Sequence, residues 1–210
     1  MNSNIDHLYY INLDKRTDRN EHVLSNVLPA FKACEGEYTR MSATDTTGHG
    51  TAGKRASGCT LSHISVYDHA KQNGFKYVIV LEDDFKPTLN SLEIDLRISR
   101  LFQNHKNFDV CQVAFNERYG CTYPVCDLLM RGENIQTTCG YIINVDFCDV
   151  LLPVFQESVE RLMSGSRPQL WACDQVWKKF QSKDSWFLTR CGKQLDDFSD
   201  IEGRKVAYNC

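Results

Sequence analysis

The sequence has no long hydrophobic run, which excludes a membrane-spanning helix. Its longest stretch without Asp, Glu, Lys or Arg has 12 residues, whereas a helix that crosses a bilayer needs about 20 apolar ones. Residues 1–7 are polar and lead into an apolar run that ends at Asp14, Lys15 and Arg16, so the N-terminus does not resemble a secretory leader. We therefore expect a cytoplasmic protein without a membrane span.

An excess of positive charge is also lacking. The chain has 24 Lys and Arg against 27 Asp and Glu, a formal net charge of −3, and no basic surface is available to neutralise the phosphates of a duplex. We therefore expect no nucleic-acid partner. With 5 Pro and 12 Gly among 210 residues, the chain lacks a linker-like composition, and its length suits one core. Residues 1–210 are predicted to form a single domain.

No two cysteines have the C-x-x-C spacing, although the chain has ten of them. The closest pair is Cys121 and Cys126, so a structural zinc site has little support. An even number of cysteines would fit disulfides in an oxidising compartment, but a chain of this size does not need them. We expect buried thiols that behave as small apolar side chains.

Short β-prone runs alternate with amphipathic segments along the chain. The five apolar residues of Tyr77–Leu81 are typical of a strand covered on both faces. The predicted strands are Leu8–Leu13, Phe75–Leu81, Val110–Phe115 and Tyr141–Val145. The predicted helices are Thr17–Phe31 with Thr17 as N-cap, Cys59–Asn73, Leu89–Gln103, Phe147–Leu152 capped by Asp146 and broken at Pro153, and Asp174–Phe180, with a loop over Ser42–Ala52. This alternation predicts an α/β fold with a mostly parallel central sheet, whose ligands collect at the carboxyl ends of the strands.

Three carboxylates, Glu82, Asp83 and Asp84, directly follow the strand predicted over Tyr77–Leu81. Because side chains alternate along a strand, Glu82 and Asp84 should face one side and Asp83 the other. Neighbouring anions need a counter-charge, and Mg²⁺ or Mn²⁺ prefers carboxylate oxygens and can hold a diphosphate at its remaining positions. We predict a metal site at Glu82 and Asp84, with a plain polar turn as the alternative.

Further polar residues lie near predicted strand ends and helix starts. Gly58, Ser62 and His63 stand at the predicted start of the second helix, where unpaired backbone N–H groups favour phosphate. Arg16 and Arg19 follow the first strand and could bind a diphosphate or lie on a solvated helix face.

Acidic residues recur late in the chain. Asp174 begins the last predicted helix, where it is either an N-cap or a general base. Asp196, Asp197 and Asp200 lie close to the C-terminus, and we expect them to be exposed tail charges.

The order of the motifs resembles glycosyltransferase family 25, which includes lipooligosaccharide galactosyltransferases and collagen hydroxylysine galactosyltransferases. Four segments are similar to the family's motifs: YYINLDKRTDR to INL-x-x-R-x-x-R, RMSATD to R-x-x-A-x-D, SGCTLSHISVYDHA to G-C-x-x-S-H, and VIVLEDD to LEDD. CGYIINVDFCDVL, WACDQVW and FSDIEGR resemble the family more weakly. The resemblance covers nearly the whole chain.

This resemblance implies a GT-A-type, Rossmann-like fold, a UDP-sugar donor, usually Mn²⁺, and inversion at the anomeric carbon. It implies that Glu82 and Asp84 bridge the metal, the diphosphate and the ribose, and that Asp174 is the catalytic base by analogy with late acidic residues of other inverting GT-A enzymes. The remaining residues that match the nucleotide surroundings or the family's motifs are Asn12, Arg16, Arg19, Asp45, Gly58, Ser62 and His63.

The sequence therefore predicts an inverting, metal-dependent enzyme that moves galactose or glucose from a UDP-sugar to a hydroxyl of a glycan or glycoprotein acceptor. The metal would stabilise the charge that develops on UDP, and one separate base would activate the acceptor hydroxyl. Two alternatives remain open. One is a metal-dependent phosphoesterase or nucleotidyltransferase that uses the same carboxylates, and the other is a non-catalytic protein that binds a UDP-sugar.

Overall fold

The computed structural model describes residues 4–32, 37–48, 50–118 and 120–207. Their main sheet has eight strands: β1 His7–Asn12, β2 Tyr38–Ser42, β3 Tyr77–Glu82, β5 Val110–Asn116, β6 Cys121–Cys126, β7 Leu129–Glu133, β8 Gln136–Asn144 and β9 Trp186–Leu188. The strand order is β2-β1-β3-β8-β5-β9-β7-β6. The pairs β1–β2, β1–β3 and β5–β9 are parallel and the other four are antiparallel, so six strands run one way and β7 and β8 run the other. The α/β fold with a mostly parallel central sheet is confirmed.

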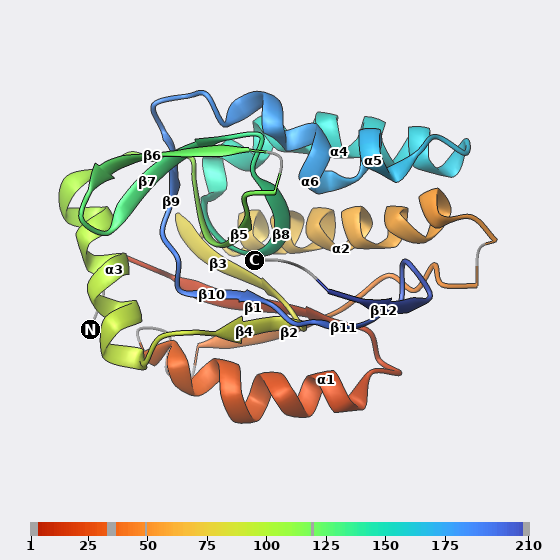
Figure 1. Ribbon diagram of the computed structural model, residues 1–210, viewed down its shortest axis with the longest axis horizontal. Coiled ribbons are helices and arrows are strands. Elements are labelled where there is room, and N and C mark those ends of the chain that lie inside the picture. The colour runs from red at the N-terminus through yellow and green to blue at the C-terminus, as the bar shows by residue number, and fades with distance from the viewer. Residues whose placement is uncertain (1–3, 33–36, 49, 119, 208–210) are drawn as a thin grey trace.

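Helices and two small hairpins complete the fold (Figure 1). The helices are α1 Thr17–His22, which continues as π-helix over Val23–Val27 and 3-10 helix over Leu28–Ala30, α2 Ala52–Gln72, α3 Ser91–Asn104, α4 Cys148–Met163 after a 3-10 turn at Val145–Phe147, α5 Pro168–Trp171, and α6 Cys173–Val176 with a 3-10 extension over Trp177–Phe180. The hairpins pair β4 Phe85–Pro87 with β10 Gly192–Gln194, and β11 Asp197–Ser199 with β12 Arg204–Val206.

Two hydrophobic cores lie on opposite faces of the sheet. On one face, Leu8 and Tyr10 of β1 pack in a core with the segment that follows α1 and with α3. On the other face, Tyr9 and Ile11 pack in a core with α2 and α4. Figure 1 shows the corresponding layers, with α1 on one side of β1–β3 and α2 and α4 on the other. Alternation along one strand thus supplies both cores, and the helices on both faces leave the strand ends open for a ligand.

Helix α2 begins seven residues earlier than predicted, at Ala52 rather than at Cys59. Thr51 is its N-cap, and the Thr51 side chain accepts a hydrogen bond from the backbone N–H of Lys54 at 3.3 Å. Gly58 and His63 therefore lie inside the helix, where intrahelical bonds occupy the backbone N–H groups. The prediction that they stand at a phosphate-binding helix start is wrong.

Four local predictions in other elements are also wrong. The N-cap of α1 is Arg16 rather than Thr17, and no side chain caps that helix. The side chain of Asn144 accepts from the backbone N–H of Asp146, so Asp146 is not the cap of the following helix. Pro153 lies inside α4, where buried neighbours such as Leu151 hold the helix on the sheet despite the missing N–H. Strand β2 was not predicted at all, because its residues are only partly buried and carry no clear apolar alternation.

The eight cysteines that the structure describes are thiols rather than disulfides. Five of them are buried, as predicted. Cys121 and Cys126 on β6 are exposed and Cys59 is half-buried, so the prediction fails for these three. Cys34 and Cys210 lie outside the described residues.

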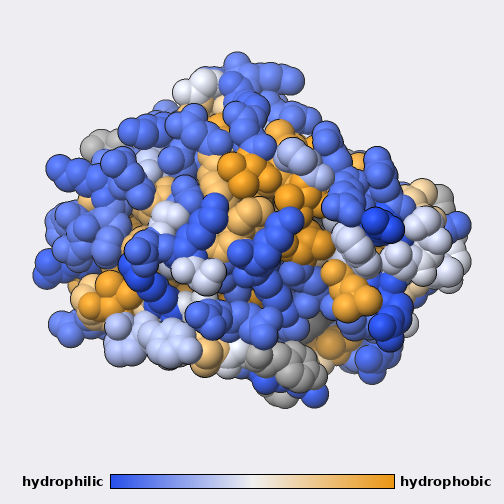
Figure 2. Space-filling view, turned by 90° about the horizontal axis from the view of Figure 1, so that it is seen from above, coloured by the Kyte–Doolittle hydropathy of each residue, from blue (hydrophilic) through white to orange (hydrophobic). Residues whose placement is uncertain are grey.

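Figure 2 shows the molecule from the side on which α4 and α5 lie, where hydrophobic residues gather near the middle of a largely hydrophilic surface. Val150 of α4 and Leu170 of α5 are among the exposed large apolar side chains. Within the described part of the chain, no helix has the length and hydrophobicity that crossing a membrane requires.

Gly58 lets helix α2 approach the loop that follows β2. A Cβ atom at this position would lie 2.3 Å from Oγ1 of Thr46 and 2.5 Å from the carbonyl oxygen of Thr44. The hydroxyl of Ser62 strengthens the contact, because it accepts from the backbone N–H of Thr44 at 2.9 Å and donates to the carbonyl of Gly58 at 2.7 Å. The pair Gly58 and Ser62 therefore fixes the loop on the helix.

We predict that Gly58→Ala destabilises the protein by about 1–3 kcal/mol, the usual cost of overpacking. Alanine improves helix propensity by about 1 kcal/mol, but the backbone carbonyl of Thr44 cannot move away cheaply, so the clash prevails. Equilibrium urea unfolding measures the change. Gly48→Ala is the matched control, because nothing lies within 4 Å of its added Cβ. Equal stabilities of the two variants would contradict the packing role of Gly58.

Candidate functional site

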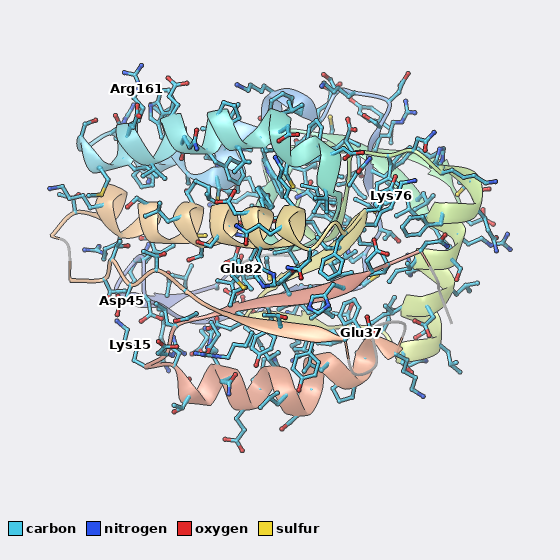
Figure 3. All side chains as sticks on the ribbon, turned by 180° about the vertical axis from the view of Figure 1, so that it is seen from behind. Lys15, Glu37, Asp45, Lys76, Glu82 and Arg161 are labelled. Carbon is cyan, nitrogen blue, oxygen red and sulfur yellow. The ribbon has the colours of Figure 1, made fainter. Side chains whose placement is uncertain are left out.

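The three carboxylates that follow β3 lie in one cavity at the carboxyl end of the sheet. Glu82 is the last residue of β3, and Asp83 and Asp84 form the turn to β4. A cavity of about 130 Å³ is lined by these residues and by Arg16, Arg19, Gly58, Ser62 and others from the loop after β2. Figure 3 places Glu82 at the centre of the molecule, beneath α2. The predicted acidic residues and four of their expected neighbours thus line one space.

The carboxylates alternate in direction as predicted. Glu82 and Asp84 both contact β8: Oε1 of Glu82 accepts from the Thr138 hydroxyl at 2.6 Å, and Oδ1 of Asp84 accepts from the Cys139 thiol at 3.3 Å. Asp83 instead faces β1, where its Oδ2 accepts from Nδ2 of Asn12 at 2.8 Å. Two carboxylates therefore point the same way.

Burial of this acidic cluster changes the pKa values of its members. Burial and the charges of Glu82 and Asp83 raise the pKa of Asp84 to about 7. Burial likewise raises the pKa of Asp83, although Asn12 opposes the shift. Burial acts in the same direction on Glu82, but the hydrogen bond and charge of His63 outweigh it, so the pKa of Glu82 is lowered. A nearby cation is what the unpaired charge of Asp84 requires.

His63 supports Glu82 rather than facing a ligand. It is fully buried in α2, with Nε2 at 3.3 Å from Oε1 of Glu82 and Nδ1 at 2.8 Å from the hydroxyl of Tyr141. Burial lowers the pKa of His63, but the hydrogen bond with Glu82 and the neighbouring Cys173 raise it more, and the net shift is upward. His63 and Glu82 thus form a charge-assisted pair in which His63 positions the carboxylate.

Arg16 and Arg19 line the cavity and are held there by the C-terminal acidic residues. Nη1 of Arg16 contacts Asp200 at 2.6 Å, and Nη2 of Arg19 contacts Asp197 at 3.1 Å. Arg19 also lies 3.5 Å from Asp83. Asp200 lines the cavity with Ser199 and Ile201. The prediction of exposed tail charges is therefore wrong for Asp197 and Asp200, because the chain end folds back over the site.

Asn12 and Asp45 lie beside the cavity and do not line it. Asn12 is buried, and its amide oxygen accepts from Arg40 while its amide nitrogen donates to Asp83. Asp45 is exposed and paired with Lys15 at 2.9 Å, near the edge of the molecule (Figure 3). Hydrogen bonds from Thr47 and Lys15 lower the pKa of Asp45 to about 2. Both residues order the surrounding loops.

Asp174 lies in a second cavity that adjoins the first. This cavity of about 300 Å³ shares Cys59, Glu82, Gln194, Ser199 and Ile201 with the first one. Asp174 is in the first turn of α6, whose N-cap is Ala172, so the N-cap interpretation of Asp174 is wrong. Burial raises the pKa of Asp174, although the backbone N–H of Thr137, 3.2 Å from Oδ2, opposes the shift.

A chain of hydrogen bonds connects Asp174 with Asp84 across the two cavities. Asp174 accepts from the backbone of Thr137, whose hydroxyl donates to Oε1 of Gln194 at 3.2 Å, and Nε2 of Gln194 donates to Asp84 at 2.8 Å. Thr137 has a φ of 76°, a strained conformation for a β-branched residue that occurs mainly at functional sites. Sequence reasoning missed Thr137 and Gln194, because no pattern marks either of them.

Comparison with known proteins bears on this site. A family model described as glycosyltransferase family 25 (LPS biosynthesis protein) matches residues 5–163. The chain belongs to glycosyltransferase family 25. The match contains the Glu82–Asp84 cluster and Gly58–His63, whereas Asp174 lies beyond it. Among curated protein sequences, no significant match to the chain is found.

Several solved structures are similar to this member of family 25 at low identity. Mannose-1-phosphate geranyltransferase from Thermus thermophilus has a TM-score of 0.46 at 12% identity, covering 90% of this chain and 74% of that one. A glycosyltransferase involved in the glycosylation of the major capsid of PBCV-1 has a TM-score of 0.45 at 12% identity, covering 93% and 95%. A197 from STIV has a TM-score of 0.42 at 12% identity, covering 97% and 94%.

We predict that, without a divalent cation, ionisation of Asp84 destabilises the fold. Its folded-state pKa of about 7 lies above the ordinary value of 3.8, so this group stabilises the folded state below about pH 4 and the contribution is lost as pH rises through 7. In Asp84→Asn the loss is absent. Urea unfolding in EDTA from about pH 5 to about pH 8 measures the difference between the two proteins.

Asp184→Asn is the control for this series, because the Asp184 side chain is 92% exposed. The control should follow the wild-type protein across the pH range. Parallel curves for the wild-type protein and Asp84→Asn would show that Asp84 does not titrate in this range.

Proposed function

We propose that this family 25 member is an inverting glycosyltransferase that moves galactose or glucose from a UDP-sugar to a hydroxyl of a glycan or glycoprotein. The observation that carries the proposal is the meeting of two cavities at Glu82, one with carboxylates and arginines and the other with Asp174. An inverting displacement needs the leaving group and the base on opposite sides of the reacting carbon. Both cavities are built within one unit, so no second domain is needed.

The first cavity suits a metal-bound diphosphate. Glu82 and Asp84 face the same side, are 21% and 14% exposed, and offer oxygen ligands to Mn²⁺ or Mg²⁺. The raised pKa of Asp84 reflects a need for positive charge that such an ion would meet. A bound ion would stabilise the charge that develops on the UDP leaving group.

Arginines and loop residues complete the donor side. Arg16 and Arg19 present planar guanidinium groups to the cavity, and such groups bind diphosphate oxygens well. Gly58 and Ser62 keep the loop after β2 in place beside them. Asn12, Asp45 and His63 support this side by ordering Asp83, the loop and Glu82 respectively.

Asp174 is the proposed base on the acceptor side. Its raised pKa brings the carboxylate closer to the value at which it accepts a proton efficiently near neutral pH. The hydrogen bond from Thr137 fixes one oxygen, Oδ2, and the other oxygen can take the proton of the acceptor hydroxyl. Proton transfer to Asp174 would accompany attack of the hydroxyl oxygen on the anomeric carbon and departure of UDP.

We predict that Asp84→Ala lowers UDP-sugar turnover by about 100-fold or more, because it removes electrostatic stabilisation of the leaving group. Mn²⁺-dependent binding of UDP should weaken in parallel. Turnover is followed as UDP release, and UDP binding by calorimetry with and without Mn²⁺. Unchanged turnover in Asp84→Ala, with Asp184→Asn as the control, would remove Asp84 from the metal site.

We predict that Asp174→Asn leaves Mn²⁺-dependent UDP binding nearly intact while transfer falls by about 10²–10⁴-fold, the usual contribution of a general base. The amide is isosteric with the carboxylate and can still accept from Thr137, so the fold should be kept. Transfer that survives in this variant would place the base elsewhere. Tight UDP binding without transfer in the wild-type protein would instead favour the non-catalytic alternative.

A further inference from the structure

Two thiols and an imidazole meet between helices α2 and α6. Cys59 and His63 lie one turn apart on α2, and Cys173 is the first residue of α6. One ligand atom from each of the three lies within 4.8 Å of the others, and the sulfur atoms of Cys59 and Cys173 are 3.8 Å apart. The two helices are more than 100 positions apart in the chain, so spacing in the sequence gives no sign of the cluster.

The separation of the sulfur atoms suits a tetrahedral metal ion. Two sulfurs that each lie about 2.3 Å from a tetrahedral Zn²⁺ are about 3.8 Å apart, which is the distance found between Cys59 and Cys173. Ligand atoms in such a site are about 3.5 Å apart on average, so the 4.8 Å limit here asks for side-chain movement on the order of 1 Å. Two sulfurs and one nitrogen are the ligands that Zn²⁺ prefers over Mg²⁺ or Mn²⁺.

The cluster can be reached from the larger cavity. Cys59 and Cys173 both line that cavity, next to Glu82, and Cys59 is half-buried rather than closed off. An ion can therefore enter from the cavity, and its fourth position would face the space that Glu82 borders. Three protein ligands with one open position is the arrangement of zinc sites that still exchange a ligand.

We propose that Cys59, His63 and Cys173 form a binding site for a thiophilic divalent cation such as Zn²⁺, separate from the carboxylate site at Glu82 and Asp84. Binding replaces the two thiol protons, which pass to the solvent as the two metal–sulfur bonds form. It also takes one ring nitrogen of His63, so it breaks the contact with either Glu82 or Tyr141. This inference does not require the proposed transferase activity.

Co²⁺ is the probe, because tetrahedral cobalt bound to thiolates absorbs visibly and shows a sulfur-to-metal charge-transfer band. The reduced wild-type protein, titrated in the absence of oxygen, should give both signals at one equivalent, and Zn²⁺ should abolish them. Cys59→Ser and Cys173→Ser should each weaken binding at least tenfold. Cys121→Ser, an exposed thiol outside the cluster, should behave as wild type.

Two further arms keep the result decisive. Asp84→Asn should keep the charge-transfer band while it loses Mn²⁺ binding, and loss of both would show one shared site instead of two. If a serine variant does not fold, protection of the wild-type Cys59 thiol from a maleimide by Zn²⁺, read by mass spectrometry, tests the same contact. Bound cobalt without a sulfur band, or no protection by Zn²⁺, would overturn the proposal.

Discussion

The site depends on three carboxylates held side by side at the end of a buried strand. Chain geometry places Glu82, Asp83 and Asp84 in one cavity, and burial there makes their mutual repulsion expensive. Each carboxylate is given a different partner: His63 and Thr138 for Glu82, Asn12 for Asp83, and Gln194 for Asp84. The described partners leave the pKa of Asp84 at about 7, and that residual demand for positive charge is the physical basis for assigning a divalent cation to the site.

Several distant parts of the chain fold toward this cluster because of its charge. Arg16 and Arg19 approach from α1, and the C-terminal residues Asp197 and Asp200 close over the two guanidinium groups. The result alternates charge in layers, from carboxylates to arginines to carboxylates. A diphosphate entering the cavity would meet arginines whose positions are already fixed, which reduces the entropy that binding must overcome. The C-terminal segment is therefore part of the site and not an appendage.

Much of the fold was predictable from the sequence, because buried strands carry apolar runs that do not depend on distant residues. The run before Glu82 identified the central strand, and the alternation of the three carboxylates followed from strand geometry. The start of α2 was misplaced because Gly53 and Gly58 look like helix breakers, whereas both permit close packing against backbone carbonyls. Gln194 and Thr137 could not be found, since their importance arises from contacts with residues more than 35 positions away. Asp197 and Asp200 were misread because only the tertiary fold brings them to the arginines.

The central claim is that a divalent cation held at Glu82 and Asp84 supports transfer from a UDP-sugar. The most direct measurement is UDP release from UDP-galactose, UDP-glucose and UDP-N-acetylglucosamine by the wild-type protein, each with Mn²⁺ and with EDTA. The account predicts release from UDP-galactose or UDP-glucose that requires Mn²⁺ and stops in EDTA. Release that is indifferent to EDTA, or no release from any of the three donors while UDP still binds, would contradict it.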